Sequence, residues 1–242
     1  MPALLEIDRV SKAFDGVQAN VDVSFAVHEG EILGLIGPNG AGKTSLFNSI
    51  SGEVTSDAGE IRFEGQRISG LGPVACARLG IARTFQVVRS FDSMTVLENV
   101  MVGAFGRASS ARAAMAAAEE VLAFTGLGAR VDTAAYLLTP PEKRRLEIAR
   151  ALATNPRLLL LDEVLTGLTP AEAQAGVQLI REIRAQGVTI IMVEHVMEVL
   201  LPLVERAVVL NLGRVLTEGR PQEIVRDPAV IKAYLGDRYA AA

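Results

Sequence analysis

The chain has 242 residues, of which 50% are apolar and 21% are charged. This composition excludes intrinsic disorder as the main state, and the length suffices for a large core in one domain or two smaller lobes. With 24 basic residues against 28 acidic ones, the formal net charge of −4 argues against nucleic acid as a partner and leaves room only for a local basic patch. The single cysteine, Cys76, cannot form an internal disulfide, so we interpret it as a small core residue in a reducing compartment.

The N-terminus and the apolar stretches give no indication of secretion or of a membrane span. The first ten residues lack a basic segment followed by an apolar core and a cleavage site. The apolar region around 188–204 is interrupted by Glu194, His195 and Glu198, so it falls short of the roughly 18 to 20 apolar residues that cross a bilayer. We therefore expect a cytosolic chain, in which any function at a membrane requires a partner.

The first third of the chain is predicted to be β structure followed by a strand, a loop and a helix. Apolar and polar residues alternate over 21–28 and again around Leu5 and Ile7, which is typical of half-buried antiparallel strands. The apolar run 32–36 then enters a glycine-rich loop, and a helix is predicted over 44–51. Further on, we expect a hairpin at 59–68 and a short helix at 73–80.

The middle of the chain is helical in character, and strand signals return after it. A capping-box pattern begins at Thr95, an alanine-rich stretch covers 111–123, and the helical character lasts to about Ala153. Apolar runs typical of buried parallel strands follow at 158–161, 188–193 and 207–210. The predicted fold class is α/β, with an antiparallel β subdomain at the start of a single domain over 1–242. We expect a core formed by 1–88 and 154–242 and a helical subdomain inserted at 89–153.

The glycine-rich loop after the strand at 32–36 carries the most specific motif. Residues 37–44 match G-x-x-x-x-G-K-[ST] between a predicted strand and a predicted helix, which is the context of a phosphate-binding loop (P-loop). Backbone N–H groups would surround phosphate oxygens, Lys43 would reach the outer phosphates and Thr44 would offer a hydroxyl to Mg²⁺. The motif predicts a nucleoside triphosphate site formed by Gly37, Pro38, Asn39, Gly40, Ala41, Gly42, Lys43, Thr44 and Ser45.

A pair of carboxylates follows the four leucines at 158–161. Ligands of open α/β sheets bind at the carboxyl ends of the strands, where Asp162 and Glu163 stand. Asp162 is predicted to hold Mg²⁺, and Glu163 to act as a general base or to position water for attack on the γ-phosphate. An isolated acidic pair could equally be a solvated strand end, so this interpretation depends on the P-loop upstream.

Together with these motifs, ARTFQ at 82–86 and VTIIMVEH at 188–195 resemble segments of the ATP-binding cassette (ABC) ATPases. The resemblance to this family extends over nearly the whole chain. The resemblance implies a P-loop NTPase core of RecA type. It also implies that Phe14 stacks on adenine, that Gln86 contacts Mg²⁺ and the attacking water, and that His195 contacts the γ-phosphate. By composition alone, Phe14 would be a core residue of the N-terminal sheet, and a lone Gln or His would mean little. The D-loop that crosses the dimer interface in this family would be Gly167, Leu168, Thr169 and Pro170.

Longer sequence segments narrow the resemblance to one branch of the family. ARLGIARTFQ, MTVLENVMVG and RRLEIARALATNPRLLLLDE followed by GLTPAE are similar to the ATP-binding subunits of branched-chain amino acid importers. They also resemble subunits of related systems for urea and amides, so the transported substrate stays open. The resemblance implies ATP and Mg²⁺ as cofactors, membrane permease subunits and, indirectly, a solute-binding protein as partners, and a place at the cytoplasmic face of the membrane. Docking to the permease would use a groove near Gln86 and the segment 87–94, where apolar Val88 and Phe91 could equally be core residues.

One segment departs from the family pattern. Where the resemblance leads us to expect a signature loop of the LSGGQ type, the chain has Leu138, Thr139, Pro140, Pro141 and Glu142. Thr139 can still offer a hydroxyl, but the prolines have no N–H for a partner's γ-phosphate and Glu142 adds a carboxylate. The prolines would also suit the first turn of a helix, and both interpretations can hold together.

The altered signature bears on the partner that we expect. Family cassettes work as dimers, so our hypothesis is that this chain pairs with a second, non-identical ABC ATPase; a homodimer and a switch that binds ATP but hydrolyses it weakly are the alternatives. The ABC ATPases of DNA repair or translation would need coiled-coil inserts, zinc-binding cysteines or two cassettes in one chain, which this sequence does not have.

Overall fold

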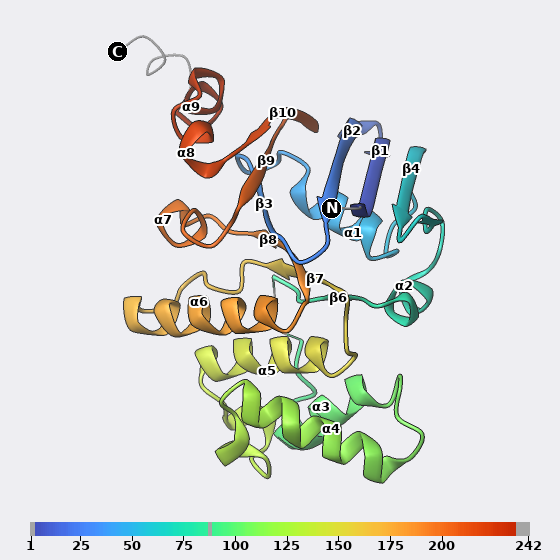
Figure 1. Cartoon of the computed structure of the whole chain (residues 1–242), viewed down its shortest axis with the longest axis vertical. Coiled ribbons are helices and arrows are strands. Elements are labelled where there is room, and N and C mark those ends of the chain that lie inside the picture. Colours follow the sequence, from blue (N-terminus) through green and yellow to red (C-terminus); the bar gives the residue numbers. More distant parts are fainter. Residues whose placement is uncertain (1–2, 87–88, 236–242) are drawn as a thin grey trace.

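The computed structural model describes residues 3–86 and 89–235, which contain two β-sheets (Figure 1). The smaller sheet is antiparallel and has the order β2-β1-β4-β5. Its long first pair confirms the predicted antiparallel strands at the N-terminus, and β4 and β5 confirm the hairpin at 59–68. The strands of this sheet are β1 (Ala3–Phe14), β2 (Val17–His28), β4 (Ala58–Phe63) and β5 (Gln66–Arg67).

The larger sheet has the order β10-β9-β3-β8-β7-β6. The strands from β9 to β6 are parallel, and β10 pairs with β9 in the antiparallel direction at the edge. The strand β10 was not predicted from the sequence. The strands are β3 (Ile32–Ile36), β6 (Ile81–Arg83), β7 (Leu158–Asp162), β8 (Thr189–Val193), β9 (Arg206–Asn211) and β10 (Arg214–Gly219).

Helices surround this sheet and extend the molecule at one end. In Figure 1, α3, α4 and α5 lie together at the end of the molecule opposite α8 and α9. The helix after the P-loop begins at Lys43, one residue earlier than predicted. The helices are α1 (Lys43–Ile50), α2 (Pro73–Leu79), α3 (Val96–Ala104), α4 (Ala111–Phe124), α5 (Pro140–Leu152), α6 (Pro170–Ala185), α7 (Met197–Leu200), α8 (Pro221–Ile224) and α9 (Pro228–Leu235), with 3₁₀ turns η1 (Gly128–Arg130) and η2 (Ala135–Leu137).

The leucines of β7 show why a continuous apolar run forms this sheet. Leu158 and Leu160 point into a core shared with α1 and the antiparallel sheet, whereas Leu159 and Leu161 point into a second core shared with α5 and α6. Successive side chains of a strand face opposite sides, so a strand that is covered on both faces has to be apolar at every position. This arrangement confirms the prediction of buried parallel strands.

The region predicted as a helical insert has its own apolar cluster. Val96 and Val100 of α3 pack there with Ala118 and Leu122 of α4. Thr95 Oγ1 accepts a bond from Glu98 N at 3.1 Å, and Glu98 Oε2 accepts one from Thr95 N at 2.8 Å, which confirms the predicted capping box. The division of the chain into a core and a subdomain stays a prediction.

Two smaller predictions concern the core and the membrane. Cys76 is buried in the core beside α1, as expected of a small core residue. None of the helices among residues 3–86 and 89–235 combines the length and the apolar character that crossing a bilayer requires.

Replacing a β7 leucine tests the two-sided burial of this sheet. Leu159 has no exposed surface, so we expect Leu159→Ala to lower the free energy of unfolding by about 3 kcal/mol, through lost transfer energy and a residual cavity. The matched control is Leu212→Ala, because Leu212 is 82% exposed and its truncation is expected to change that free energy by less than about 0.5 kcal/mol. Equal effects of the two changes in chemical denaturation would contradict the assignment.

Candidate active site

The P-loop between β3 and α1 is shaped by close contacts with its surroundings. Gly42 has φ +100°, and a Cβ there would lie 2.2 Å from the carbonyl oxygen of Ala19. Gly37 has φ +150°, and its Cβ would lie 2.1 Å from the carbonyl oxygen of Leu210. Buried Asn20 donates from Nδ2 to the carbonyl oxygen of Gly42 at 3.1 Å. The motif therefore needs glycine at both positions for steric reasons, and Asn20 is a supporting residue that sequence reasoning missed.

Lys43 lies buried inside the loop that precedes it. Its Nζ donates to the carbonyl oxygens of Gly37 and Pro38 at 2.6 and 3.0 Å, so the ammonium is held under the loop. Burial lowers the pKa of Lys43, and the negative charges of Glu163 and Asp162 oppose that effect. The ammonium thus lies where the field of two carboxylates favours its charged form, as a phosphate-binding lysine requires.

Glu163 occupies the centre of the site. It follows β7 with φ +53°, and its N–H donates to the carbonyl oxygen of Val193 at 2.9 Å, which ties it to the end of β8. Gln86 Nε2 donates to Glu163 Oε2 at 3.1 Å, and His195 Nε2 lies 2.5 Å from Glu163 Oε1. The structure therefore brings Gln86, Glu163 and His195 together from three distant parts of the chain, although the roles assigned to them stay predictions.

Asp162 is more buried than the sequence suggested. Only 2% of the residue is exposed, and its Oδ2 accepts a bond from Arg83 Nη2 at 3.0 Å. Burial raises the pKa of Asp162, and the hydrogen bond and charge of Arg83 oppose the increase. Arg83 lies in the segment ARTFQ, but its neighbours in the sequence do not indicate its contact with Asp162, which is 79 positions away.

The P-loop, Gln86, Glu163 and His195 line a polar cavity of about 450 Å³. The sequence analysis did not anticipate its wall from β2, which consists of Val17, Gln18 and Ala19. Of the residues predicted to bind ATP or Mg²⁺ or to act in catalysis, Phe14, Gly37, Pro38 and Asp162 do not line it, and neither do the predicted signature and D-loop residues. Those that do are Asn39, Gly40, Ala41, Gly42, Lys43, Thr44, Ser45, Gln86, Glu163 and His195.

The donor set fits Mg²⁺ held jointly by protein and substrate. The candidate ligands are the Thr44 hydroxyl, the Asp162 carboxylate and the Gln86 amide, all hard oxygen donors of the kind that Mg²⁺ prefers. Among residues 3–86 and 89–235, no group of three or more His, Cys, Asp or Glu side chains is arranged to hold a metal by itself. Such a set suits an ion that takes its remaining ligands from phosphates and water.

Phe14 is a surface residue. It ends β1 with 41% of its surface exposed, and Lys12 Nζ lies 5.3 Å from the centre of its ring. The alternative interpretation of Phe14 as a core residue of the sheet is therefore wrong. Stacking of its ring on adenine stays a prediction.

The altered signature segment begins α5. Glu142 accepts bonds from the N–H and the hydroxyl of Thr139, each at 2.9 Å, and from Arg130 Nε at 2.9 Å. The bond from the Thr139 N–H is the main cause that lowers the pKa of Glu142. Pro140 and Pro141 are the first residues of the helix, as one of the two interpretations predicted, while Leu138 is buried. The Thr139 hydroxyl donates to Glu142 of its own chain, and the role of the segment toward a partner's ATP stays a prediction.

The segment just before the predicted D-loop is held by a buried carboxylate. Glu194 accepts bonds from Leu165 N at 2.7 Å and Thr166 Oγ1 at 3.0 Å, and burial raises its pKa. Gly167 and Leu168 follow this anchor, and Thr169 caps α6, which starts at Pro170. Glu194 thus links the end of β8 to the segment after Glu163, a role that no motif indicated.

Comparison with known proteins identifies the family. Residues 21–166 match the family model described as ABC transporter, and residues 214–240 match the one described as branched-chain amino acid ATP-binding cassette transporter. The high-affinity branched-chain amino acid transport ATP-binding protein BraF of Pseudomonas aeruginosa is 38% identical over 97% of this chain and 98% of its own. The lipopolysaccharide export system ATP-binding protein LptB of Acidithiobacillus ferridurans is also 38% identical, over 99% of each chain.

A solved structure agrees with these relatives. The ADP conformation of an ATP-binding cassette of an ABC transporter superposes with a TM-score of 0.89 at 30% identity, over 98% of this chain and 100% of that one. The chain therefore belongs to the ABC transporter family and is one of its ATP-hydrolysing cassettes. The predicted α/β fold with a P-loop core is confirmed.

Alanine at two glycines of the P-loop separates steric contact from backbone strain. Gly42→Ala combines a positive φ with a clash against Ala19, so we expect the free energy of unfolding to fall by about 3 kcal/mol and ATP binding to be lost. At Gly40, φ is +78° and no atom lies within 4 Å of an added Cβ, so Gly40→Ala should cost only about 1 kcal/mol. Chemical denaturation and nucleotide titration measure both effects, and equal costs would refute the steric argument.

Proposed function

We propose that this cassette is the ATP-hydrolysing subunit of an ABC importer for branched-chain or related small amino acids. The observation that carries the catalytic part is the position of Glu163 between Gln86 and His195, beside a P-loop lysine. ATP would bind with its phosphates against the loop N–H groups and Lys43. Glu163 would orient the attacking water, while His195 and Gln86 contact the γ-phosphate region.

The roles of the individual side chains follow from their contacts. Glu163 is held on two sides, so its carboxylate is oriented before substrate arrives, and preorganisation of this kind lowers the barrier to reaction. Lys43 neutralises charge on the outer phosphates from inside the loop. Bound Mg²⁺, held by Thr44, Asp162 and Gln86, would offset the negative charge that develops on the phosphates.

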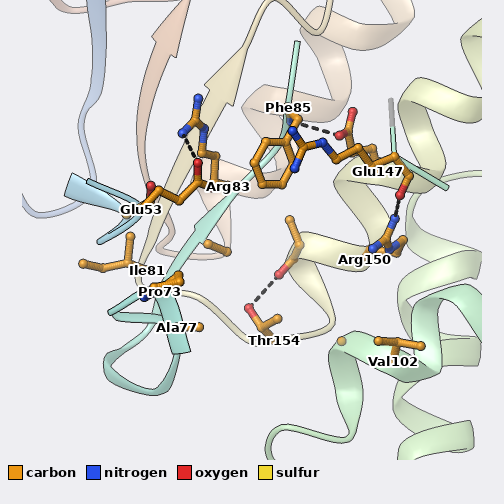
Figure 2. Close-up of a pocket in the computed structure, with 15 residues that line it drawn as sticks. Glu53, Pro73, Ala77, Ile81, Arg83, Phe85, Val102, Glu147, Arg150 and Thr154 are labelled. Carbon is orange, nitrogen blue, oxygen red and sulfur yellow. Dashed lines mark hydrogen bonds and ion pairs between the residues drawn. The ribbon is translucent and has the colours of Figure 1, made fainter. Parts of the chain in front are cut away.

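Docking to a permease is proposed at a second cavity, of about 260 Å³, between β6, α2, α3 and α5 (Figure 2). Residues of its walls bond to the chain before and after Gln86: Phe85 N donates to Glu147 Oε1 at 2.9 Å, and Arg150 donates to the carbonyl oxygen of Arg89. An apolar floor with charged walls suits a short helix of a partner.

Within the predicted docking segment, Phe91 is partly exposed beneath Arg150, whereas Val87 and Val88 lie outside the described residues. Attachment there would place the chain at the cytoplasmic face of the membrane.

The substrate assignment rests on the relatives. BraF bears a branched-chain amino acid transport name, and the match of residues 214–240 to the branched-chain family model points the same way. LptB, equally identical, belongs to lipopolysaccharide export, which makes that cargo the competing candidate. We favour amino acids because both the BraF match and the match to the branched-chain family model name them; a solute-binding protein would then be an indirect partner.

A second, non-identical ABC ATPase is the partner that we propose for this chain. Pro140 and Pro141 offer no N–H, and Glu142 places its carboxylate at the start of α5. A γ-phosphate brought there by a second copy would meet negative charge instead of N–H donors. The alternatives are a homodimer that tolerates this signature and a weakly hydrolysing switch.

Replacing the proposed base tests the catalytic assignment. Glu163→Gln should keep ATP binding and reduce Mg²⁺-dependent hydrolysis by about 100-fold or more, because the amide cannot accept a proton from water. Glu119→Gln, an exposed carboxylate on α4, is the matched control and should leave turnover unchanged. Turnover of Glu163→Gln equal to that of the unmodified chain would contradict the role of Glu163.

The pairing proposal is tested by turnover as a function of chain concentration and partner. The purified chain alone should bind ATP tightly and turn it over slowly at every concentration, and adding a candidate partner cassette should raise the rate. In that heterodimer, Glu163→Gln in this chain alone should abolish most of the turnover. A rate per chain that rises with concentration without a partner would establish the homodimer. Undiminished turnover of the mutated heterodimer would contradict the proposal that the site with Glu163 of this chain performs most of the hydrolysis.

A further inference from the structure

A buried arginine lies directly behind the active site. Arg83 is the last residue of β6, and only 6% of its side chain is exposed. Its Nη1 donates to Asn48 Oδ1 of α1 at 2.5 Å, and its Nη2 donates to Asp162 Oδ2 of β7 at 3.0 Å. One guanidinium therefore connects the helix that follows the P-loop to the carboxylate assigned to Mg²⁺.

Aromatic rings fix the orientation of this guanidinium. Its central carbon lies 5.6 Å from the centre of the Phe47 ring and 5.2 Å from that of Phe85. Packing on two rings, together with two hydrogen bonds, restricts the rotation of the Arg83 side chain. The guanidinium is thus held in one orientation and donates to two acceptors at once, which a lysine ammonium could not reproduce with the same geometry.

The same side chain also forms part of the wall of the docking cavity. Figure 2 shows Arg83 between Glu53 and Phe85, and the dashed line marks the 3.6 Å ion pair of Arg83 with Glu53. The Glu53 side chain is one-third exposed, whereas that of Asp162 is 3% exposed. The pair with Asp162 is therefore the shorter and far less solvated of the two.

A carboxylate as buried as Asp162 needs a specific partner. A buried polar group without a hydrogen-bond partner is costly, so an unpartnered carboxylate would turn away. Residues behind a metal ligand fix its orientation. Arg83 meets both needs, since it supplies a positive charge and a directed bond to one oxygen of the carboxylate.

From this geometry we infer that Arg83 is a positioning residue for Mg²⁺ binding, which holds the Asp162 carboxylate in the correct orientation from the side of the docking cavity. The inference rests on the proposed role of Asp162 in binding Mg²⁺ with ATP. Arg83 itself does not line the nucleotide cavity, so it acts only through Asp162 and Asn48.

The experiment compares binding of a fluorescent ATP analogue to the full chain with and without Mg²⁺, alongside Mn²⁺ titration followed by electron paramagnetic resonance. Arg83→Gln should bind the analogue normally without metal and lose about 10-fold in metal affinity, the usual cost of removing a residue behind a metal ligand. Arg83→Lys keeps the charge but cannot span Asn48 and Asp162, so its loss should be smaller. A merely structural role would weaken binding equally with and without metal.

Further variants serve as controls. Glu53→Gln removes the exposed partner of Arg83 and should change metal affinity by no more than about twofold, because exposed ion pairs contribute little. Arg62→Gln removes a surface arginine that pairs with Glu60 and should change nothing. Asn48→Ala removes the acceptor of the Arg83 Nη1 hydrogen bond but leaves the bond between Arg83 and Asp162 in place. We expect a partial loss of metal affinity.

The outcomes separate this inference from the proposed function. If the unmodified chain binds the analogue identically with and without Mg²⁺, the proposed metal role of Asp162 fails first. If the unmodified chain depends on metal and a folded Arg83→Gln has the same metal affinity, only the inference about Arg83 is overturned. Should Arg83→Gln not fold, normal metal affinity in both Arg83→Lys and Asn48→Ala would overturn it equally.

Discussion

The order of the parallel strands determines the rest of the site. The strands β3, β8, β7 and β6 are neighbours in the large sheet and run in the same direction, so their carboxyl ends share one edge (Figure 1). The P-loop follows β3, His195 comes shortly after β8, Glu163 follows β7 and Gln86 comes shortly after β6. Hydrogen bonding between adjacent strands therefore brings four chain segments together at one edge of the sheet, without any long loop having to fold across the molecule.

Buried charged side chains at this edge have specific charged or hydrogen-bonding partners. Lys43 lies in the field of Glu163 and Asp162, Asp162 pairs with Arg83, and the buried carboxylate of Glu194 binds the segment after Glu163. Each charge is expensive alone and acceptable with its partner, so the network specifies one arrangement of the strand ends. Its cost is offset by the apolar cores on both faces of the sheet.

Local signals in the sequence predicted the fold and the centre of the site well. The capping box at Thr95, the apolar β7 run and the glycines of the P-loop each depend on neighbours within a few residues. Contacts between distant residues were not predictable in this way: Arg83 meets Asp162 across 79 positions. Phe14 illustrates another limit, because an aromatic residue in an alternating strand gives no indication of whether its end of the strand is covered. The edge strand β10 was missed because RVLTEG has only two strongly apolar residues.

The two helix N-termini with family motifs differ in what they offer an anion. At α1, the N-cap is Gly42, the first turn has no acidic residue and no side chain occupies the cap, so N–H groups and the positive end of the helix dipole stay available to phosphate. At α5, the first helical residues are prolines without N–H groups, and Glu142 brings its own carboxylate to the cap. The start of α1 is therefore suited to phosphate, whereas the start of α5 is satisfied internally. Two copies of this chain would pair a phosphate-binding α1 with a self-capped α5 at both sites, and only a partner with an uncapped helix start would give one site a full set of donors.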